Sequence, residues 1–240
     1  FLMTARAQAL RNTMFSTIGI YTAYFLGMLT SIFIARQLGP DDYGAYSAII
    51  WLVAMGVAIS NAGTASAVIK FVAELRGSER DELIAPTVAY LRKAQHWFML
   101  AVIVAVGLLL LLSGQHIATG FDHWMIFGFL AIAIGLRSQY MFNVGIAKGF
   151  EDFRVTAIVA GIATPINLAM VVLAWILDAE VEALLAVFLI SGVIFYAISQ
   201  RLTSRLIQPA TTQVQLPEDF QRRVKRHMRL VAITVTIGFF

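Results

Sequence analysis

The sequence predicts an all-α integral membrane protein: a six-helix transmembrane bundle followed by the start of a seventh helix. Hydrophobic residues make up 59% of the chain and charged residues 13%, with a mean hydropathy of +0.78. Soluble domains carry about 25% charged residues. Residues 14–35 and 43–69 are uncharged runs of 22 and 27 residues. Each run exceeds the roughly 20 apolar residues that a helix needs to cross a bilayer.

The first two helices are predicted at about 12–35 and 43–69, joined by a short polar turn. Gly39-Pro40 breaks the first helix, and Asp41 and Asp42 follow where carboxylates stabilise the start of the next one. The first apolar run is too long for the core of a signal peptide, so it is predicted to be a retained helix.

Four more membrane helices are predicted from the remaining apolar runs, at about 97–112, 124–147, 155–177 and 183–199. These complete a transmembrane lobe over residues 1–199. Residues 70–96 are predicted as a charged connection with a break at Gly77-Ser78, where Gly77 ends one helix and Ser78 can cap another. Residues 200–228 are predicted as a basic cytoplasmic linker whose end, residues 221–229, begins a helix. Residues 229–240 are predicted as a truncated seventh helix of about half a span.

The distribution of Lys and Arg predicts the orientation. Of the 18 cations, 16 fall before the first helix, between helices two and three, between helices four and five, or after helix six. Arg36 alone lies on the other side, and Arg137 lies within helix four. Because cytoplasmic segments carry an excess of Lys and Arg, the N-terminus is predicted to be cytoplasmic.

Arg137 is the candidate for a ligand-binding residue because it lies near the middle of a predicted span. A charge there costs at least about 2.5–3.5 kcal/mol and usually faces a cavity or a partner. Its alternative role is to snorkel toward the headgroups. We favour the cavity, with a phosphorylated headgroup as ligand, since guanidinium binds phosphate bidentately. Further candidate lining residues are Tyr140 and Asn143 on the same helix, and Tyr21, Tyr24 and Asn61 on neighbouring helices.

Several chemistries have no support in the sequence. The chain has no Cys, no Walker A loop and no metal-binding spacing among its four His residues, and no Asp or Glu falls inside helices one to six. No enzyme activity, cofactor or metal is therefore predicted. The excess of Lys and Arg over Asp and Glu is explained by the cations on one side of the membrane, so no nucleic-acid partner is predicted either.

The turn also carries a family resemblance. Ile34-Ala-Arg-Gln-Leu-Gly-Pro-Asp-Asp-Tyr-Gly44 resembles the first helix-to-helix turn of the Wzx-type flippases, in which an aliphatic-Ala-Arg-x-Leu-Gly-Pro-acid-x-Tyr-Gly pattern recurs. Asn12, Asn61-Ala-Gly63 and Phe71-Val-Ala-Glu74 resemble the same family, which belongs to the multidrug/oligosaccharidyl-lipid/polysaccharide exporter superfamily. The match covers residues 12–75, and only the hydropathy matches beyond them.

The resemblance implies a fold and a function. The bundle would be the N-terminal lobe of a two-lobe transporter in the bacterial plasma (inner) membrane. It would flip a polyprenyl-(pyro)phosphate-linked oligosaccharide from the cytoplasmic to the outer leaflet, for O-antigen, lipopolysaccharide or exopolysaccharide export. Its partners would be that lipid-linked oligosaccharide, membrane lipids, a polysaccharide polymerase and other assembly proteins.

Three alternatives remain open. A multidrug exporter of the same superfamily would usually need an intramembrane carboxylate, which this part of the chain lacks. A membrane enzyme acting on polyprenyl-phosphate sugars would need acids or His clustered at a membrane face, whereas the acids here are scattered. A non-transporting scaffold would leave the mid-membrane Arg137 unexplained.

Overall fold

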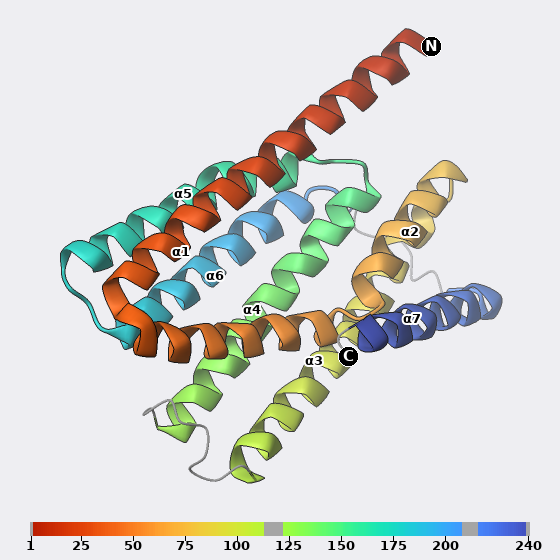
Figure 1. Ribbon diagram of the computed structural model, residues 1–240. Helices are drawn as coiled ribbons and strands as arrows, with labels where there is room; N and C mark the ends of the chain where they lie inside the picture. Colours follow the sequence, from red (N-terminus) through yellow and green to blue (C-terminus); the bar gives the residue numbers. More distant parts are fainter. Residues whose placement is uncertain (1, 113–121, 208–215, 239–240) are drawn as a thin grey trace.

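The computed structural model describes residues 2–112, 122–207 and 216–238, and within them the regular structure is helical, with no strand. The predicted all-α class is therefore confirmed. Figure 1 shows long helices lying side by side in a bundle, with α2 and α7 set against one end. Five segments among the described residues are long and apolar enough to cross a membrane: Thr13–Ser60, Asp81–Leu112, His123–Gly149, Arg154–Ile176 and Val181–Thr203. The protein is thus a multi-pass membrane protein.

The first two predicted helices form one continuous element with a sharp bend, α1 (Leu2–Ser60). The bend lies at Gly39, whose φ of 70° and ψ of −177° are not helical, and Pro40 follows it. Gln37 helps to fix the bend, because its side-chain amide donates hydrogen bonds to the carbonyls of Ala174 and Ala179 at the end of α5. Figure 1 shows the two arms of α1 diverging from this point.

The predicted boundaries after the first bend differ from the structure. The expected helix over 43–69 stops at Ser60, and a new helix, α2 (Thr64–Gly77), begins after the turn at residues 61–63. The expected charged connection over 70–96 is also helical. It contains most of α2, a short 3-10 turn (Asp81–Leu83) and the first half of α3 (Ile84–Leu112). The prediction equated helices with apolar runs, but these helices continue past the apolar segments that predicted them.

The next three helices begin and end within a few residues of their predicted bounds. They are α4 (His123–Gly149), α5 (Arg154–Ile176) and α6 (Val181–Thr203). α1 packs mainly against α5, and α4 packs mainly against α6 and α2. One core cluster joins α1, α3, α4 and α6 through large buried side chains such as Ile49, Leu130, Ile134 and Leu184. This packing places the middle of α4, which carries Arg137, beside α6.

The last helix, α7 (Glu218–Gly238), lies partly within the segment that was expected to be a linker over 200–228. Phe220, Val224 and Met228 recur every fourth residue, so they form one apolar stripe on this helix. The stripe packs against α2 in a second core cluster that includes Phe71 and Leu75. Helix formation here depends on the amphipathic pattern and not on overall hydrophobicity. The basic helix start predicted over residues 221–229 is confirmed, and the helix begins three residues earlier, at Glu218.

Candidate ligand-binding site

Arg137 lies between two aromatic rings of α6. The carbon at the centre of its guanidinium is 4.7 Å from the centroid of the Phe188 ring and 4.7 Å from that of Phe195. The two phenylalanines are seven residues apart, which is a rise of about 10 Å along a helix, and both lie on one face. The guanidinium is therefore held between the rings by cation–π interactions, which are worth about 2 kcal/mol or more when desolvated.

The charge on Arg137 is not neutralised by a neighbouring acid. Its side chain is partly buried, its Nε atom is buried without a hydrogen-bond partner, and the part of the chain that the structure describes offers it no ion pair. Its electrostatic neighbours include Tyr46 and Tyr140. Tyr140 packs edge-on against Phe195, with ring centroids 5.2 Å apart. The arrangement is an aromatic cage around a cation that can still attract an anion.

Asn143, the third candidate on α4, belongs to a different set of contacts. It is fully buried and accepts a hydrogen bond of 3.1 Å from Nη2 of Arg92 on α3. Its side-chain nitrogen donates to Ser199 Oγ (3.3 Å) and Gln200 Oε1 (3.0 Å), both on α6. Because its amide is fully engaged, Asn143 joins three helices.

Asn61 lies in the turn between α1 and α2 and has a similar structural role. Its side-chain oxygen accepts a hydrogen bond of 3.0 Å from Gln95 Nε2, which also donates to the Ser138 carbonyl at 2.8 Å. Its own amide nitrogen donates to the Val57 carbonyl. Gln95 thereby connects the end of α1 to the middle of α4.

Tyr21 and Tyr24 lie apart from these contacts, on an exposed face of α1. Their relative exposures are 71% and 76%, and they share this face with the exposed Thr17 and Ser31. The structure thus brings Arg137 together with Tyr140 and links Asn143 and Asn61 to helix-joining networks. The two tyrosines of α1, Tyr21 and Tyr24, remain exposed.

Sequence reasoning missed Arg92 and Gln95, which the structure places inside the bundle. Both fall in the segment that was expected to be a connection. The buried positions of α3 include Ile84, Thr87, Val88, Leu91 and Gln95. That spacing of three and four residues is the signature of a helix face, so the signal was present in the sequence.

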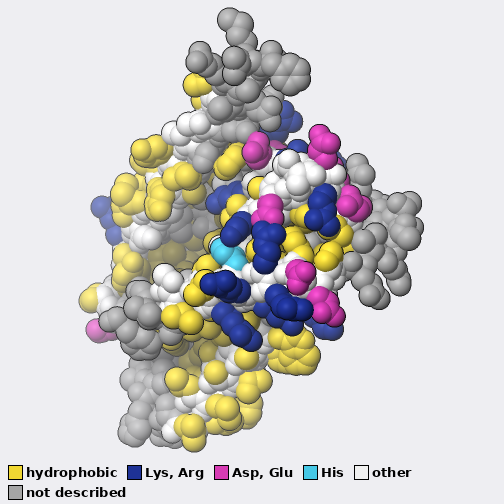
Figure 2. All heavy atoms as spheres, turned by 90° about the vertical axis from the view of Figure 1, so that its right-hand side faces the viewer, with side chains coloured by type: hydrophobic (Ala, Val, Ile, Leu, Met, Phe, Trp, Pro, Cys, Tyr) yellow, Lys and Arg dark blue, Asp and Glu magenta, His cyan; other side chains and the backbone are white. Residues whose placement is uncertain are grey.

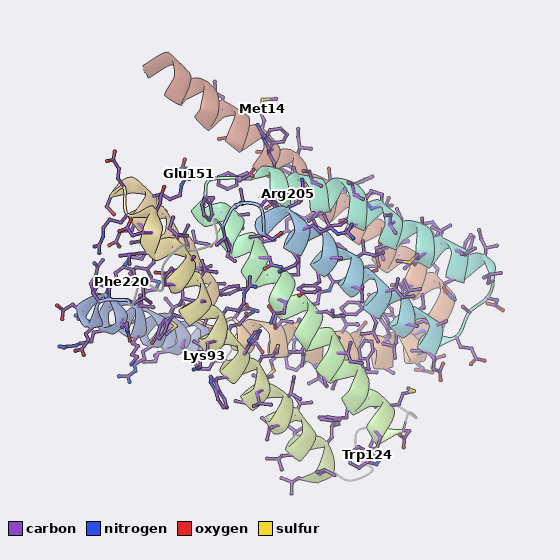
Figure 3. All side chains as sticks on the ribbon, turned by 180° about the vertical axis from the view of Figure 1, so that it is seen from behind. Met14, Lys93, Trp124, Glu151, Arg205 and Phe220 are labelled. Carbon is purple, nitrogen blue, oxygen red and sulfur yellow. The ribbon has the colours of Figure 1, made fainter. Side chains whose placement is uncertain are left out.

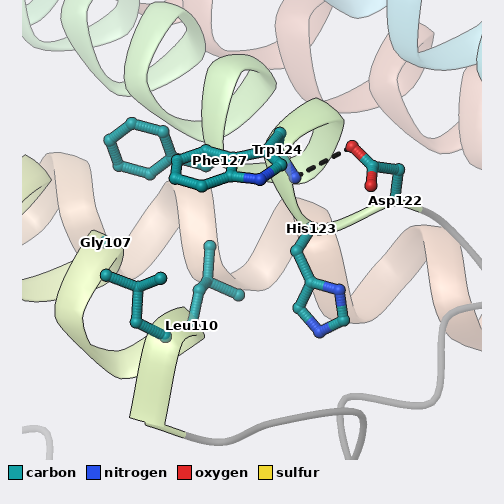
Figure 4. Close-up of a pocket in the computed structure, with 7 residues that line it drawn as sticks. Gly107, Leu110, Asp122, His123, Trp124 and Phe127 are labelled. Carbon is teal, nitrogen blue, oxygen red and sulfur yellow. Dashed lines mark hydrogen bonds between the residues drawn. The ribbon is translucent and has the colours of Figure 1, made fainter.

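A separate cavity of about 430 Å³ lies between the ends of α3 and α4. Its lining is mostly apolar, with Gly107, Leu110, Trp124 and Phe127 among its residues (Figure 4). Asp122 lines the cavity too, but its carboxylate caps α4 by accepting hydrogen bonds of 3.1 Å from the Trp124 and Met125 amides. None of the six predicted site residues lines this cavity.

The family model for polysaccharide biosynthesis proteins matches residues 9–237. The structure of a MOP superfamily transporter from Pyrococcus furiosus is similar to this fold, with a TM-score of 0.64 and 15% sequence identity, over 96% of this chain and 52% of the transporter. The chain therefore spans about half the length of that protein. No curated protein sequence matches the chain significantly.

Proposed function

The chain belongs to the polysaccharide biosynthesis protein family, and from this membership we propose that it forms one lobe of a flippase. The proposed substrate is a polyprenyl-(pyro)phosphate-linked oligosaccharide, moved from the cytoplasmic to the outer leaflet of a bacterial inner membrane. The product would serve the export of a cell-surface polysaccharide such as O-antigen or exopolysaccharide. A polysaccharide polymerase and other assembly proteins would act with it.

The observation that carries this proposal is the unpaired charge of Arg137 within a membrane-spanning segment. A flippase must draw a phosphate or pyrophosphate group out of water, and a desolvated anion is stable only beside fixed positive charge. Arg137 supplies that charge in His123–Gly149, with no ion pair among the residues that the structure describes. Phe188 and Phe195 hold the guanidinium in place, so its position is set before a ligand arrives.

The tyrosines of α1 would add a second surface to the proposed binding site. A lobe with about half the length of a related transporter leaves room for a second lobe. The exposed face that includes Tyr21 and Tyr24 is mixed, with the hydroxyls of both tyrosines beside the apolar Ile18, Phe25 and Met28. We assign this face to the space between the two lobes, where the rings could stack on sugars.

The test compares variants of Arg137 in the complete protein. We expect Arg137→Ala to insert normally, because it removes an insertion penalty, and to lose glycan export. Arg137→Lys should keep part of the export, since the charge remains while the bidentate fork is lost. Surface glycan is measured at matched protein level.

Arg205→Ala is the matched control, because Arg205 is an exposed arginine at the end of the bundle (Figure 3). It should export as the unmodified protein does. Full export by Arg137→Ala would make Arg137 a structural anchor and would remove the basis of the proposal.

A further inference from the structure

The exposed face of α7 is strongly basic. Arg222, Lys225, Arg226 and Arg229 are all exposed, and their spacing of three and four residues places them on one side of the helix. Figure 2 shows Lys and Arg side chains gathered on the face of the molecule that α2 and α7 form. Leu230 and Ile233 follow directly, and each is 57% exposed. One helix thus exposes cations first and large apolar side chains next.

Two adjoining clefts lie on this face. One, of about 460 Å³, is lined by Arg222, Lys225, Arg226, Arg229 and Leu230. The other, of about 260 Å³, lies between α7 and α2 and is lined by Lys70, Phe71, Arg223, Arg226, His227 and Leu230. Arg226 and Leu230 line both clefts, so the clefts share a border. Cationic groups surround an apolar contact in each, which suits a ligand with an anionic head and an apolar tail.

Most of these cations lack an acidic partner. Arg222 pairs with Glu218 at 3.4 Å, and Arg223 pairs with Glu74 at 2.7 Å, which attaches α7 to α2. Lys70, Lys225, Arg226 and Arg229 form no ion pair within the described residues. We call these four residues the basic face. Its net positive charge is therefore available to an external anion.

The basic face lies beside the end of an apolar segment that is long enough to cross a membrane. The apolar segment Thr13–Ser60 stops just before Gly63. At Gly63, an added Cβ would lie 2.4 Å from the Met228 carbonyl oxygen, so the two backbones touch. Arg226 and Arg229 flank Met228 in the sequence. These cations are consequently close to the depth at which phospholipid headgroups meet the acyl chains.

We propose that the basic face binds the phosphate headgroups of acidic phospholipids while Leu230 and Ile233 enter the acyl boundary. A helix with cations beside large apolar side chains is typical of an interfacial helix. Each Lys or Arg near an anionic leaflet is worth about fivefold in binding. Nucleic acid or an acidic protein would match the cations but not the exposed Leu230 and Ile233. Acidic lipid would thus hold α7 and the adjoining end of α2 at the membrane surface.

The test uses one introduced thiol, since the 240 residues contain no cysteine; cysteines elsewhere in the complete protein are first replaced by serine. The complete protein carrying Ile233→Cys with a fluorophore is placed in vesicles of phosphatidylcholine with a minor fraction of phosphatidylglycerol. In one set only the phosphatidylglycerol carries brominated chains, and in the other only the phosphatidylcholine does. We expect phosphatidylglycerol to quench the label well beyond its share of the lipid.

Two matched double variants separate the basic face from general charge. Arg226→Gln/Arg229→Gln should lower the binding constant of phosphatidylglycerol relative to phosphatidylcholine at the label by about fivefold for each cation removed. Arg201→Gln/Arg205→Gln removes the same charge from exposed residues outside the face, and should leave the enrichment unchanged. Circular dichroism confirms that each variant retains its helices.

Three outcomes would overturn the proposal. In the first, each lipid quenches the label of the parent protein in proportion to its share of the bilayer. In the second, both double variants lose enrichment equally. In the third, inorganic pyrophosphate displaces the lipid at matched ionic strength. The last outcome would assign the face to soluble phosphates. The proposal is independent of glycan transport, so a failure of the export test would leave this result unaffected.

Discussion

Arg92 on α3 donates a hydrogen bond of 3.1 Å to the side-chain oxygen of Asn143 on α4. The same Asn143 amide reaches Ser199 and Gln200 on α6. Asn143 follows Arg137 by six residues, a rise of about 9 Å along α4. The proposed ligand-binding charge and a three-helix polar contact therefore lie at successive levels of one helix.

Replacing the buried amide should destabilise the bundle. We expect Asn143→Leu, which is similar in size, to lower stability by about 1–3 kcal/mol because it leaves the buried groups of Arg92 and Gln200 unpaired. The apparent melting temperature in detergent measures the effect. Tyr24→Leu alters an exposed side chain and serves as the control. Equal melting temperatures for both variants would show that the polar contact contributes nothing.

Gly63 should tolerate substitution less well than Gly39, although both have positive φ. Gly39 has a φ of 70° and open space around an added Cβ, whereas Gly63 has a φ of 78° and the Met228 backbone at 2.4 Å. We expect Gly39→Ala to cost only backbone strain, about 1–3 kcal/mol, because a φ of 70° with a ψ of −177° is a conformation that almost only glycine adopts. Gly63→Ala should cost more and also release α7. Trypsin should cut at the basic residues of α7 faster in Gly63→Ala than in Gly39→Ala or the parent protein. Equal rates of digestion in all three would contradict the release of α7.

The aromatic cage predicts a measurable coupling between Arg137 and Phe195. We expect Phe195→Leu to destabilise the protein more in the parent background than in Arg137→Met, with a coupling of about 1 kcal/mol. Melting temperatures of the two single variants and the double variant complete the cycle. Phe188→Leu should behave in the same way. Additive effects would mean that the rings pack beside the guanidinium without attracting its charge.

The orientation in the membrane is testable with single cysteines. Ser78 follows the end of α2 and Glu180 precedes the start of α6, and both residues are exposed. Figure 1 shows these two helix ends on opposite sides of the bundle. If the basic end faces the cytoplasm, Ser78→Cys should react with an impermeant maleimide only in opened cells. Glu180→Cys should react in intact cells. The reverse pattern would invert the proposed topology.

The three helices α4, α5 and α6 were predictable because each coincides with an uncharged or nearly uncharged run. The full extents of α2, α3 and α7 were not, since these helices carry charged faces and continue outside the apolar segments. Their signals were periodic instead: the buried positions of α3 recur every three or four residues, as do Phe220, Val224 and Met228 on α7. The helix end at Gly77 and a helix start within residues 221–229 were predicted correctly, whereas the amount of helix within residues 70–96 was not.

Arg137 could be singled out from the sequence, because its position along the apolar run is enough to show a charge near the middle of a predicted span. The residues that contact Arg137 could not be predicted from the sequence. Phe188 and Phe195 are far from Arg137 in sequence, and only the packing of α6 against α4 brings them to the guanidinium.

The sequence by itself determined that this is a helical membrane protein, since hydrophobicity and charge act locally along the chain. Tertiary structure alone decided which polar groups face one another: Asn143 meets Arg92, Asn61 meets Gln95, and Tyr21 remains exposed. The physical reason is that a buried polar group must find a hydrogen-bond partner. Which partner it finds depends on how helices that are distant in sequence pack together, and the local pattern of residues does not predict that packing.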